Sequence, residues 1–485
     1  MGLRFHNTLS GRVEEFVALE PGRVRMYTCG PTVYQYAHIG NFRTFVFQDL
    51  LRRYLRYRGY ELHHVMNITD VDDKTIANAA AAGLSLRDYT EKYRQAFFAD
   101  AQLLNVKTPE VVACATHHIA DMVALVQRLQ EKGYAYRSDG SYYYRIARFA
   151  DYGKLSKIDP KGMRAGARVD VEEYAKSDPR DFALWKAAKP GEPFWETAIG
   201  RGRPGWHIEC SAMSMKYLGP HFDIHTGGVD LIFPHHENEI AQSEAATGEK
   251  FVNYWLHAEH LIVEGERMGK SKGNFFTLRD LVARGAKPSA IRYLLASVPY
   301  RKPLNFTFDA LQQAARSVER VRNFRLRLET EKFSSGSTPA LAERAAQAQR
   351  AFESALDDDL NTAEALAAVF NLVRDANTAM DRGEFRQGDV SVVLEVLTRW
   401  DEIFFVLADD DFARLQAYQE KLEEPVLVGG GDGVLSDAEV EARLQERVEA
   451  RKQRDFARAD RIREELAARG IIVEDTKNGV RWKRR

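Results

Sequence analysis

Hydrophobic and polar positions alternate in patterns that predict a strand, a helix and a second strand at the start of the chain. In residues 1–75, a short apolar segment at 24–27 ends at a Gly-Pro break, and another at 63–69 ends at a group of aspartates. Between them, apolar residues recur at helical spacing from Phe42 to Leu50. This order predicts a βαβ unit and therefore a parallel sheet.

The rest of the chain changes pattern three times. Residues 74–133 have mostly helical spacing, which places Cys114 in a helical segment, whereas 134–205 contain short aromatic strands with many Gly, Pro and Lys residues. Residues 206–265 return to the α/β pattern, with strands predicted at 222–225 and 256–263 and a helix beginning near Pro234. From 278 to 425 the pattern is almost wholly helical.

Length, charge and cysteine content narrow the class of protein. A chain of 485 residues predicts about three domains at roughly 150 residues each. The net charge of −1 excludes a general polycation, so any surface that binds nucleic acid must be local. Three cysteines and no apolar run of about 18 residues predict a protein of a reducing compartment, here the cytoplasm, without a membrane partner.

Cysteine, histidine and glutamate residues supply candidate metal ligands. Cys29 follows the first strand, Cys210 lies far along the chain, and His235 and Glu239 are four residues apart near a helix start. One helical turn puts that imidazole and that carboxylate on one face, and two thiolates would complete a tetrahedral Zn²⁺ site. Two distant cysteines are also common as buried apolar thiols, and His236 offers a substitute imidazole on a different face.

Two segments with glycine are candidates for binding phosphate. His38-Ile39-Gly40-Asn41 opens the first helix, whose N-terminus offers free N–H groups and a positive dipole. The segment 267–275 gathers three cations and two glycines in one loop, where lysine suits phosphate oxygens. A histidine that only caps its helix and a solvated basic loop are the structural alternatives. The sequence contains no Walker A loop.

Arginines near the end of the chain form a stripe on one predicted helical face. Its members are Arg443, Arg447, Arg451, Arg454, Arg458 and Arg461, and the chain ends with Arg481, Trp482, Lys483, Arg484 and Arg485. Such a stripe could follow a phosphate backbone, with the tryptophan available for base stacking. Acidic residues interleave with the arginines, so an ordinary exposed charged helix is an equal alternative.

Taken together, these segments resemble the cysteinyl-tRNA synthetases, a family of class I aminoacyl-tRNA synthetases. The resemblance rests on the order and spacing of several motifs along most of the chain. They are Cys-Gly-Pro-Thr-Val-Tyr from Cys29, the HIGH-type segment 38–41, Asn-Ile-Thr-Asp from Asn67, Gly-Trp-His-Ile-Glu-Cys from Gly205, 234–239, the KMSKS-type segment 267–271, Asp-Asp-Asp-Leu-Asn-Thr from Asp357, and Asp-Phe-Ala-Arg-Ala-Asp from Asp455.

The resemblance implies a mixed α/β protein. Its Rossmann-type parallel-sheet catalytic domain would contain an inserted connective module and be followed by an α-helical domain and a small C-terminal module. The implied segments are a first catalytic half at 1–120, the connective insertion at 121–205, a second half with zinc ligands at 206–265, a KMSKS-loop and stem-contact region at 266–318, a tRNA-binding helical bundle at 319–422, a Gly-rich linker at 423–436 and a basic anticodon-binding module at 437–485.

The resemblance also implies one Zn²⁺ per chain, held by Cys29, Cys210, His235 and Glu239. In the family this metal binds the thiolate of the substrate cysteine. A soft metal prefers sulfur and deprotonates a thiol of pKa about 8.5 far more readily than an alcohol, so serine is rejected without an editing domain. Whether the thiolate takes a fifth position or displaces a ligand stays open.

The implied reaction joins L-cysteine to tRNA(Cys) in two steps, through cysteinyl-adenylate with release of pyrophosphate and then acyl transfer to the 3′-terminal ribose of the tRNA. Positioning and charge stabilisation carry both steps. The residues implied at ATP, which Mg²⁺ accompanies, are His38, Gly40, Asn41, His257, Lys270 and Ser271, of which His38, Asn41 and Lys270 have catalytic roles. Those implied at the amino acid are Cys29, Gly30, Thr69, Trp206 and Asp230.

Three positions depart from the family pattern. Asn41 stands where HIGH has its second histidine, Arg267 replaces the first lysine of KMSKS, and Gly269 replaces its first serine. Lys270, which the resemblance marks as the important cation, is kept, so activity is expected. The effect of the three departures on the rate stays open.

Two other functions fit part of this pattern. A ligase that joins cysteine to an amino sugar would share the catalytic core, but it has no use for a tRNA-binding module at 430–485. A non-catalytic zinc- and nucleotide-binding paralogue would not be expected to keep His38, Lys270 and all four implied zinc ligands. We also expect a monomer.

Overall fold

The computed structural model describes residues 2–158, 176, 178–423, 443–448, 450, 458–459, 462–463, 466, 471–476 and 479–484. The chain divides into two compact units, Met1–Pro425 and Val426–Arg485. Among the described residues, no helix is long and apolar enough to cross a membrane.

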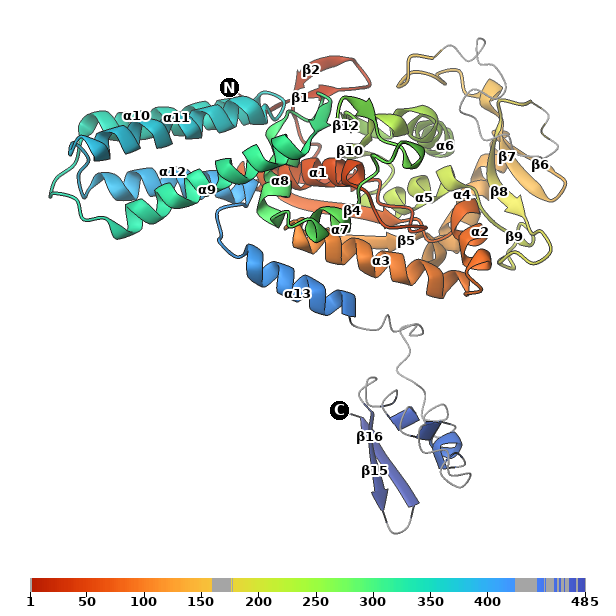
Figure 1. Cartoon of the computed structure of the whole chain (residues 1–485). Helices are drawn as coiled ribbons and strands as arrows, with labels where there is room; N and C mark the ends of the chain where they lie inside the picture. Colours follow the sequence, from red (N-terminus) through yellow and green to blue (C-terminus); the bar gives the residue numbers. More distant parts are fainter. Residues whose placement is uncertain are drawn as a thin grey trace. The chain divides into compact units, whose positions relative to one another are not determined.

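A parallel sheet of five strands forms the centre of the first unit (Figure 1). Its strands are, in spatial order, β11 (Val252–Ala258), β10 (Phe222–Gly228), β3 (Arg23–Thr28), β4 (Glu61–Ile68) and β5 (Val111–Cys114). The helix α1 (Ile39–Tyr57) connects β3 to β4. This βαβ unit and the parallel sheet confirm the predicted fold class. In such sheets, ligands bind outside the carboxyl ends of the strands.

Helices cover both faces of this sheet. Met26 and Ile224 belong to the same hydrophobic cluster as α1 and α3 (Leu86–Leu103). The adjacent Tyr27 belongs instead to the cluster of the opposite face, because successive strand residues point to opposite sides. The helices of that opposite face are α4 (Ile119–Glu131), α5 (Trp206–Leu218) and α6 (Glu237–Thr247), and α2 (Asp73–Ala81) precedes α3.

The aromatic strands predicted within 134–205 form a separate antiparallel sheet. It consists of β6 (Ala135–Ser138), β7 (Ser141–Tyr144), β8 (Phe182–Ala187) and β9 (Gly202–Pro204). Residues 159–175 and 177, between β7 and β8, lie outside the described part of the chain.

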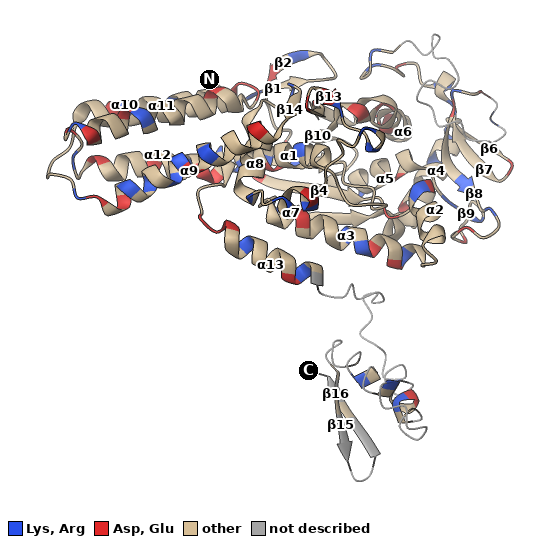
Figure 2. Ribbon diagram, viewed as in Figure 1, with Lys and Arg blue, Asp and Glu red and all other residues tan. Residues whose placement is uncertain are grey.

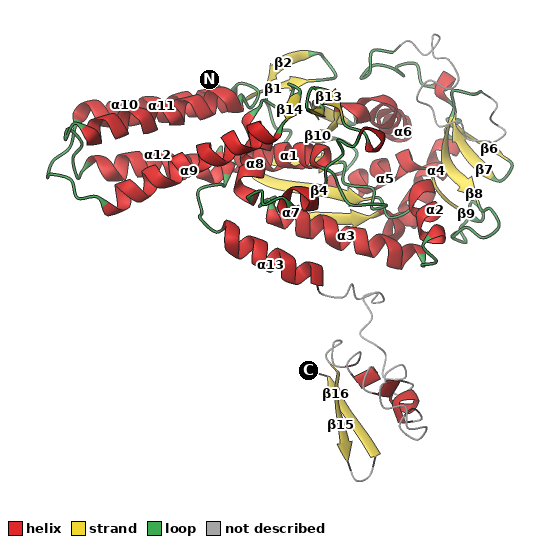
Figure 3. Ribbon diagram, in the orientation of Figure 1, coloured by secondary structure: helices red, strands yellow, loops and turns green. Residues whose placement is uncertain are grey.

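After the central sheet the chain becomes mainly helical, as predicted (Figure 3). A small sheet of β13 (Glu266–Arg267), β12 (Leu261–Val263) and β14 (Leu304–Phe306) comes first. The helices of this part are α7 (Leu278–Ala283), α8 (Pro288–Ser297), α9 (Phe308–Thr330), α10 (Pro339–Asp357), α11 (Thr362–Asp381), α12 (Asp389–Phe404) and α13 (Asp411–Glu423).

A buried cluster of charges joins α1 to the helical part. The Asp49 carboxylate lies 2.7 Å from Arg53 Nε and 2.6 Å from Arg292 Nη2, and the side chains of Asp49 and Arg292 are fully buried. Arg292, on α8, also donates to the carbonyl of Phe404 at the end of α12. One carboxylate therefore fixes α1, α8 and α12 to one another.

The aspartate motif that begins at Asp357 also has a structural role. Asp357 accepts from Tyr54 on α1, and Asp358 pairs with Arg4 of β1 (Arg4–Asn7). Asp359 accepts from the backbone N–H of His6 in the same strand and from the Tyr300 hydroxyl. The motif therefore closes the beginning of the chain onto the helical part.

Three sequence predictions of local structure were wrong. Cys114 ends strand β5 rather than lying in a helix, and β1 with its partner β2 (Arg12–Glu15) was missed. These strands have only four residues each, too few for a clear alternation. Residues 256–263 form parts of two strands in different sheets. The helix expected near Pro234 is present: after a kink at Phe233 the backbone is helical, and α6 follows from Glu237.

In the second unit, β15 (Ile471–Thr476) and β16 (Gly479–Arg484) form an antiparallel hairpin. Trp482 packs against its small hydrophobic cluster. The predicted arginine stripe is only partly exposed, because Arg447 is buried and both Arg443 and Arg458 pair with Glu446. Of the predicted basic residues, Arg451, Arg454, Arg461 and Arg485 lie outside the described residues, as do residues 424–436 of the predicted linker.

Candidate functional site

One cleft opens at the carboxyl ends of β3 and β10. Several residues that the sequence singled out line it, namely Cys29, Gly30, His38, Gly40, Asn41, Trp206 and Asp230. Cys29 directly follows β3, and His38 directly precedes α1. The thiol and the imidazole therefore belong to one strand–turn–helix unit.

His38 and Asn41 form the N-terminal cap of α1. Asn41 donates its backbone N–H to His38 Nδ1 at 3.2 Å, and Asn41 Oδ1 accepts the His38 backbone N–H at 3.0 Å. This reciprocal pairing satisfies two N–H groups that a helix start leaves free. It leaves His38 Nε2 and the Asn41 Nδ2 group for a ligand. A side chain at Gly40 would press on this cap, since an added Cβ would lie 3.0 Å from the His38 ring.

His38 is neutral at physiological pH. Burial, opposed by the charge of Asp230 and reinforced by that of Lys270, lowers the pKa of His38 to about 4. Because Nδ1 accepts a hydrogen bond, the single proton of the neutral ring lies on Nε2. His38 therefore offers one N–H donor to the cleft.

The KMSKS-type loop lies against this helix start. The Ile39 backbone N–H donates to the Phe276 carbonyl at 2.9 Å, and Lys270 Nζ donates to Gln35 Oε1 at 2.5 Å. Ser271 follows in the exposed turn Lys270–Lys272. An added Cβ at Gly269 would meet nothing closer than 3.9 Å, so lack of space does not explain this departure from the family pattern.

Four predicted metal ligands gather at the buried side of the cleft. Cys29 Sγ lies 3.9 Å from Cys210 Sγ and 3.8 Å from Glu239 Oε1, and His235 Nε2 lies 3.1 Å from Glu239 Oε1. All four side chains are buried. His207 is hydrogen-bonded to His235 Nδ1, which directs Nε2 toward the cluster.

These distances fit a tetrahedral zinc site. Two sulfurs at about 2.3 Å from a tetrahedral zinc would be about 3.8 Å apart, and a nitrogen and an oxygen at about 2.0 Å would be about 3.3 Å apart. The observed separations of 3.9 Å and 3.1 Å are close to these values. The cluster is therefore compatible with zinc.

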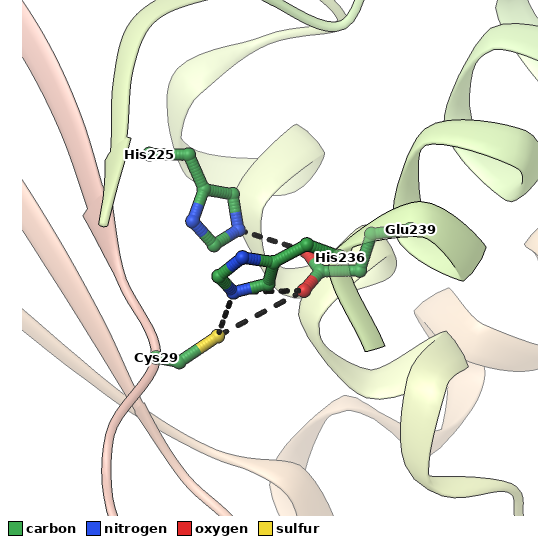
Figure 4. Close-up of side chains that lie close together, drawn as sticks. All are labelled: Cys29, His225, His236 and Glu239. Atoms are coloured by element: carbon green, nitrogen blue, oxygen red, sulfur yellow. Dashed lines mark hydrogen bonds and ion pairs between the residues drawn. The ribbon is translucent and has the colours of Figure 1, made fainter. Parts of the chain in front are cut away.

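Two further histidines face the same carboxylate (Figure 4). His225 Nε2 lies 2.9 Å from Glu239 Oε2, and His236 Nε2 lies 3.3 Å from Cys29 Sγ. The sequence assigned His225 no role. It placed His236 on a different helix face, but His236 stands three residues before Glu239, a neighbouring position on a helix, and its Nε2 lies 3.9 Å from Glu239 Oε1. A second four-residue set with these histidines is compact enough to hold an ion. It has one thiolate rather than two.

The charges within the cluster depend on one another. Burial alone would raise the pKa of Glu239, but the imidazoles of His225 and His235 outweigh it and lower that pKa to about 2. Burial raises the pKa of the Cys29 thiol, and the nearby Cys210 and Glu239 act in the same direction. A divalent cation would relieve this competition, because it favours the deprotonated form of every donor.

The remaining predicted site residues lie at different depths in and behind the cleft. Trp206 stacks on His235, with ring centroids 4.2 Å apart. Thr69 is buried, and its hydroxyl donates to the Glu209 carboxylate at 2.8 Å. The sequence analysis gave Glu209 no role, although it belongs to the Gly-Trp-His-Ile-Glu-Cys motif. His257 lies behind the cluster, hydrogen-bonded to His236 and Thr8. Its contact with adenosine therefore stays a prediction.

A glycine is unavoidable at the bottom of the cleft. The Gly30 backbone N–H donates to Asn67 Oδ1 at 2.8 Å. An added Cβ would lie 1.7 Å from the backbone oxygen of Asn67, which cannot move without breaking the sheet edge. Position 30 therefore accepts no side chain.

Comparison with known proteins decides the family. Residues 15–316 match the model of the class I (C) tRNA synthetase catalytic domain, 351–407 the DALR domain, and 436–482 the cysteinyl-tRNA ligase anticodon binding domain. Over the full length of both chains, the sequence is 59% identical to the cysteine–tRNA ligase of Solibacter usitatus and 56% identical to that of Koribacter versatilis. The chain belongs to the cysteinyl-tRNA synthetase family.

Solved structures of other class I synthetases share the fold of this cysteinyl-tRNA synthetase family member. Mycobacterium tuberculosis methionyl-tRNA synthetase bound by methionyl-adenylate has a TM-score of 0.60 at 15% identity, over 81% of this chain and 93% of that chain. A leucyl-tRNA synthetase ternary complex of Agrobacterium radiobacter K84 has a TM-score of 0.58 at 11% identity, over 82% and 86% of the two chains.

The lowered pKa of His38 can be tested directly in this family member. Its imidazole should stay neutral as the pH falls from 8 through the ordinary histidine pKa of about 6.5, and become protonated only near pH 4. A histidine NMR titration measures this, with the His38→Asn variant identifying the signal. A midpoint for His38 near pH 6.5 would show that burial does not control its charge.

Proposed function

We propose that the protein is a cysteine–tRNA ligase that forms cysteinyl-adenylate from L-cysteine and ATP and then transfers the cysteinyl group to tRNA(Cys). The observation that carries this proposal is the shared cleft of Cys29 and His38. A cluster suited to a thiol and a helix start suited to phosphate are separated by nine residues on one rigid unit. The full-length relatives named cysteine–tRNA ligase support the same conclusion.

We assign one Zn²⁺ to Cys29, Cys210, His235 and Glu239. When bound, the metal supplies a soft Lewis acid that favours a thiolate over an alcohol. The residues of the chain fix the direction in which the thiol enters. Trp206, stacked on His235, and Asp230 line the cleft on the amino-acid side, and Gly30 packs against the Asn67 backbone at its bottom.

In the first step the carboxylate oxygen of cysteine bonds to the α-phosphorus of ATP as the bond to pyrophosphate breaks. His38 Nε2–H would donate to a phosphate oxygen without losing its proton, and the Asn41 amide would assist. Lys270 would leave Gln35 and contribute a charge, while Gly40 and Ser271 let the backbone approach. Mg²⁺ accompanies ATP. Catalysis then rests on positioning and charge stabilisation, with no covalent intermediate on the protein.

The experiment that tests this function is cysteine-dependent exchange between ATP and pyrophosphate, followed by charging of tRNA(Cys). Both activities are expected from the purified chain. Exchange accompanied by acylation of an amino sugar, without charging of tRNA, would refute the proposal in favour of the rival ligase. Absence of exchange would favour a non-catalytic paralogue.

Replacing Cys210 should remove the metal. Cys210→Ser exchanges a soft ligand for a hard, neutral one, so the bound zinc measured after dialysis should fall from one per chain to a small fraction. The matched control is Cys114→Ser, since Cys114 ends β5 away from the cluster and should keep its zinc. Equal zinc contents in the two variants would contradict the assigned ligand set.

Replacing Lys270 should slow adenylate formation without weakening cysteine binding. Lys270→Ala removes a charge used only at the phosphates, so kcat for exchange should fall by about 10²-fold or more while KM for cysteine changes little. Lys272→Ala is the control, because Lys272 lies in the same loop and pairs with Glu266 instead. A wild-type exchange rate in Lys270→Ala would remove this residue from its role.

The helical part offers a surface for tRNA. A groove on α9 is lined by Arg316, Arg320 and Arg327, together with Glu319, Asn323 and Phe324 and with Asn377 of α11. Arg327 pairs with Glu331 and Asp381, and Glu319 pairs with Lys287. Arg316 and Arg320 are exposed, and neither has an acidic side chain at ion-pair distance within the described residues. Figure 2 shows basic residues along α9. Cations on one helix face suit the phosphates of an RNA backbone.

Removing these cations should affect tRNA alone. In the double variant Arg316→Ala/Arg320→Ala, KM for tRNA should rise by about tenfold and depend less steeply on salt, whereas exchange, which uses no tRNA, should match wild type. Arg350→Ala, an exposed arginine on α10 that pairs with Glu343, is the control. An unchanged KM for tRNA would show that the groove is only a charged surface.

The anticodon-binding role of residues 437–485 is part of the same proposal. It is supported by the match of 436–482 to the anticodon binding domain model. The domain boundaries, the monomeric state and the cytoplasmic location stay predictions.

A further inference from the structure

The guanidinium of Arg279 joins the two signature segments from beside the cleft. Arg279 is the second residue of α7, which follows the KMSKS-type loop, and its Cζ lies 4.1 Å from the centre of the Tyr36 ring. Tyr36 lies two residues before His38 and lines the cleft. Arg279 belongs to none of the motifs that the sequence singled out. Its contact nevertheless spans the same two segments that carry His38 and Lys270.

The guanidinium itself is held by groups from two other helices. Arg279 Nε lies 3.5 Å from Asp100 Oδ1, and the Tyr418 hydroxyl donates to the same oxygen at 2.5 Å. Asp100 lies on α3 with a fully buried side chain, and Tyr418 lies on α13. Burial raises the pKa of Asp100 to about 6, with the charge of Arg279 acting in the opposite direction. Asp100 therefore faces Arg279 as an ion-pair partner, without a hydrogen bond to Nε.

Two hydrogen bonds also tie the same segments together, and one of them cannot last through the reaction. The hydrogen bond from the Ile39 backbone to the Phe276 carbonyl uses no side chain. The other hydrogen bond joins Lys270 to Gln35. In the proposed function, Lys270 must leave Gln35 to reach the phosphates. The Arg279–Tyr36 stack then remains between the segments, together with the edge-to-face contact of His38 and Phe275, whose ring centroids lie 5.2 Å apart.

We propose that Arg279 is a positioning residue for adenylate formation, which holds the His38 segment and the Lys270 segment in register while Lys270 is on the nucleotide. This inference rests on the proposed function. The transition state needs a donor from each segment at the same time, so a small relative shift lowers the rate. A planar guanidinium can stack on a tyrosine ring and pair with a carboxylate at once, which an ammonium group does less well.

The test measures kcat for cysteine-dependent ATP–pyrophosphate exchange in Arg279→Met, Tyr36→Leu and the double variant. Each single variant should lose on the order of tenfold in kcat, with KM for cysteine nearly unchanged. The double variant should be no slower than the slower single variant, because either change alone already removes the contact between Arg279 and Tyr36. Tyr36→Phe keeps the ring and should lose less than Tyr36→Leu.

Arg201→Met is the matched control. Arg201 stacks on Phe194 at the same distance of 4.1 Å, but in the loop before β9, away from the signature segments. This variant should exchange at the wild-type rate. Tyr36→Leu also separates loss of the stack from loss of the buried ion pair, since it leaves the pair of Asp100 and Arg279 intact. The melting temperature and zinc content of every variant are measured beside the rates.

Three results would overturn the inference while wild-type exchange upheld the proposed function. They are wild-type kcat in both single variants, a loss in the double variant equal to the product of the single losses, and losses that follow a lowered melting temperature or zinc content. A wild-type protein without exchange would instead refute the proposed function, and this inference with it.

Discussion

The buried carboxylate of Asp49 is the interaction on which the arrangement of the first unit depends. It lies between Arg53 and Arg292, and it fixes the helix that carries His38 to the helices that follow the catalytic sheet. A buried ion pair contributes little net stability, because removing the charges from water offsets their attraction. Its effect is on geometry, since leaving either arginine unpaired would cost several kcal/mol. Alternative packings of α1 that leave these charges unpaired are therefore disfavoured.

The fixed position of α1 also fixes the side of the cleft that is formed by the first turn of this helix. His38 and Asn41 cap each other, so the donor that faces the cleft is also part of the helix start. Cys29 follows the strand that precedes the same turn, and Gly30 is locked beneath Asn67. In the proposed function, recognition of sulfur and binding of phosphate thus share one backbone unit.

Local periodicity was enough to predict the βαβ core, because β3 and β4 are buried on both faces and α1 shows a regular apolar spacing. It missed β1, β2 and β5, which are too short to show alternation. Of the metal cluster, Cys29, Cys210, His235 and Glu239 came from motif order, while His225 was missed because nothing local indicates that β10 approaches α6. Arg279 could not be found either. Its role depends on Asp100 and Tyr418, which are separated from each other by 318 residues.

The closure of Arg4 onto Asp358 has a consequence for how the chain is made. These residues are 354 positions apart, and Asn7 of the same strand also needs Asn253. At ribosomal speeds of about 5–20 residues per second, roughly 20–70 s separate the synthesis of Arg4 from that of Asp358. Within that time β1 can pair with β2, but Phe5, fully buried in the finished protein, still lacks the cover that later elements such as β11 supply. A strand edge that stays uncovered during synthesis is a binding site for a chaperone at the exit of the ribosomal tunnel.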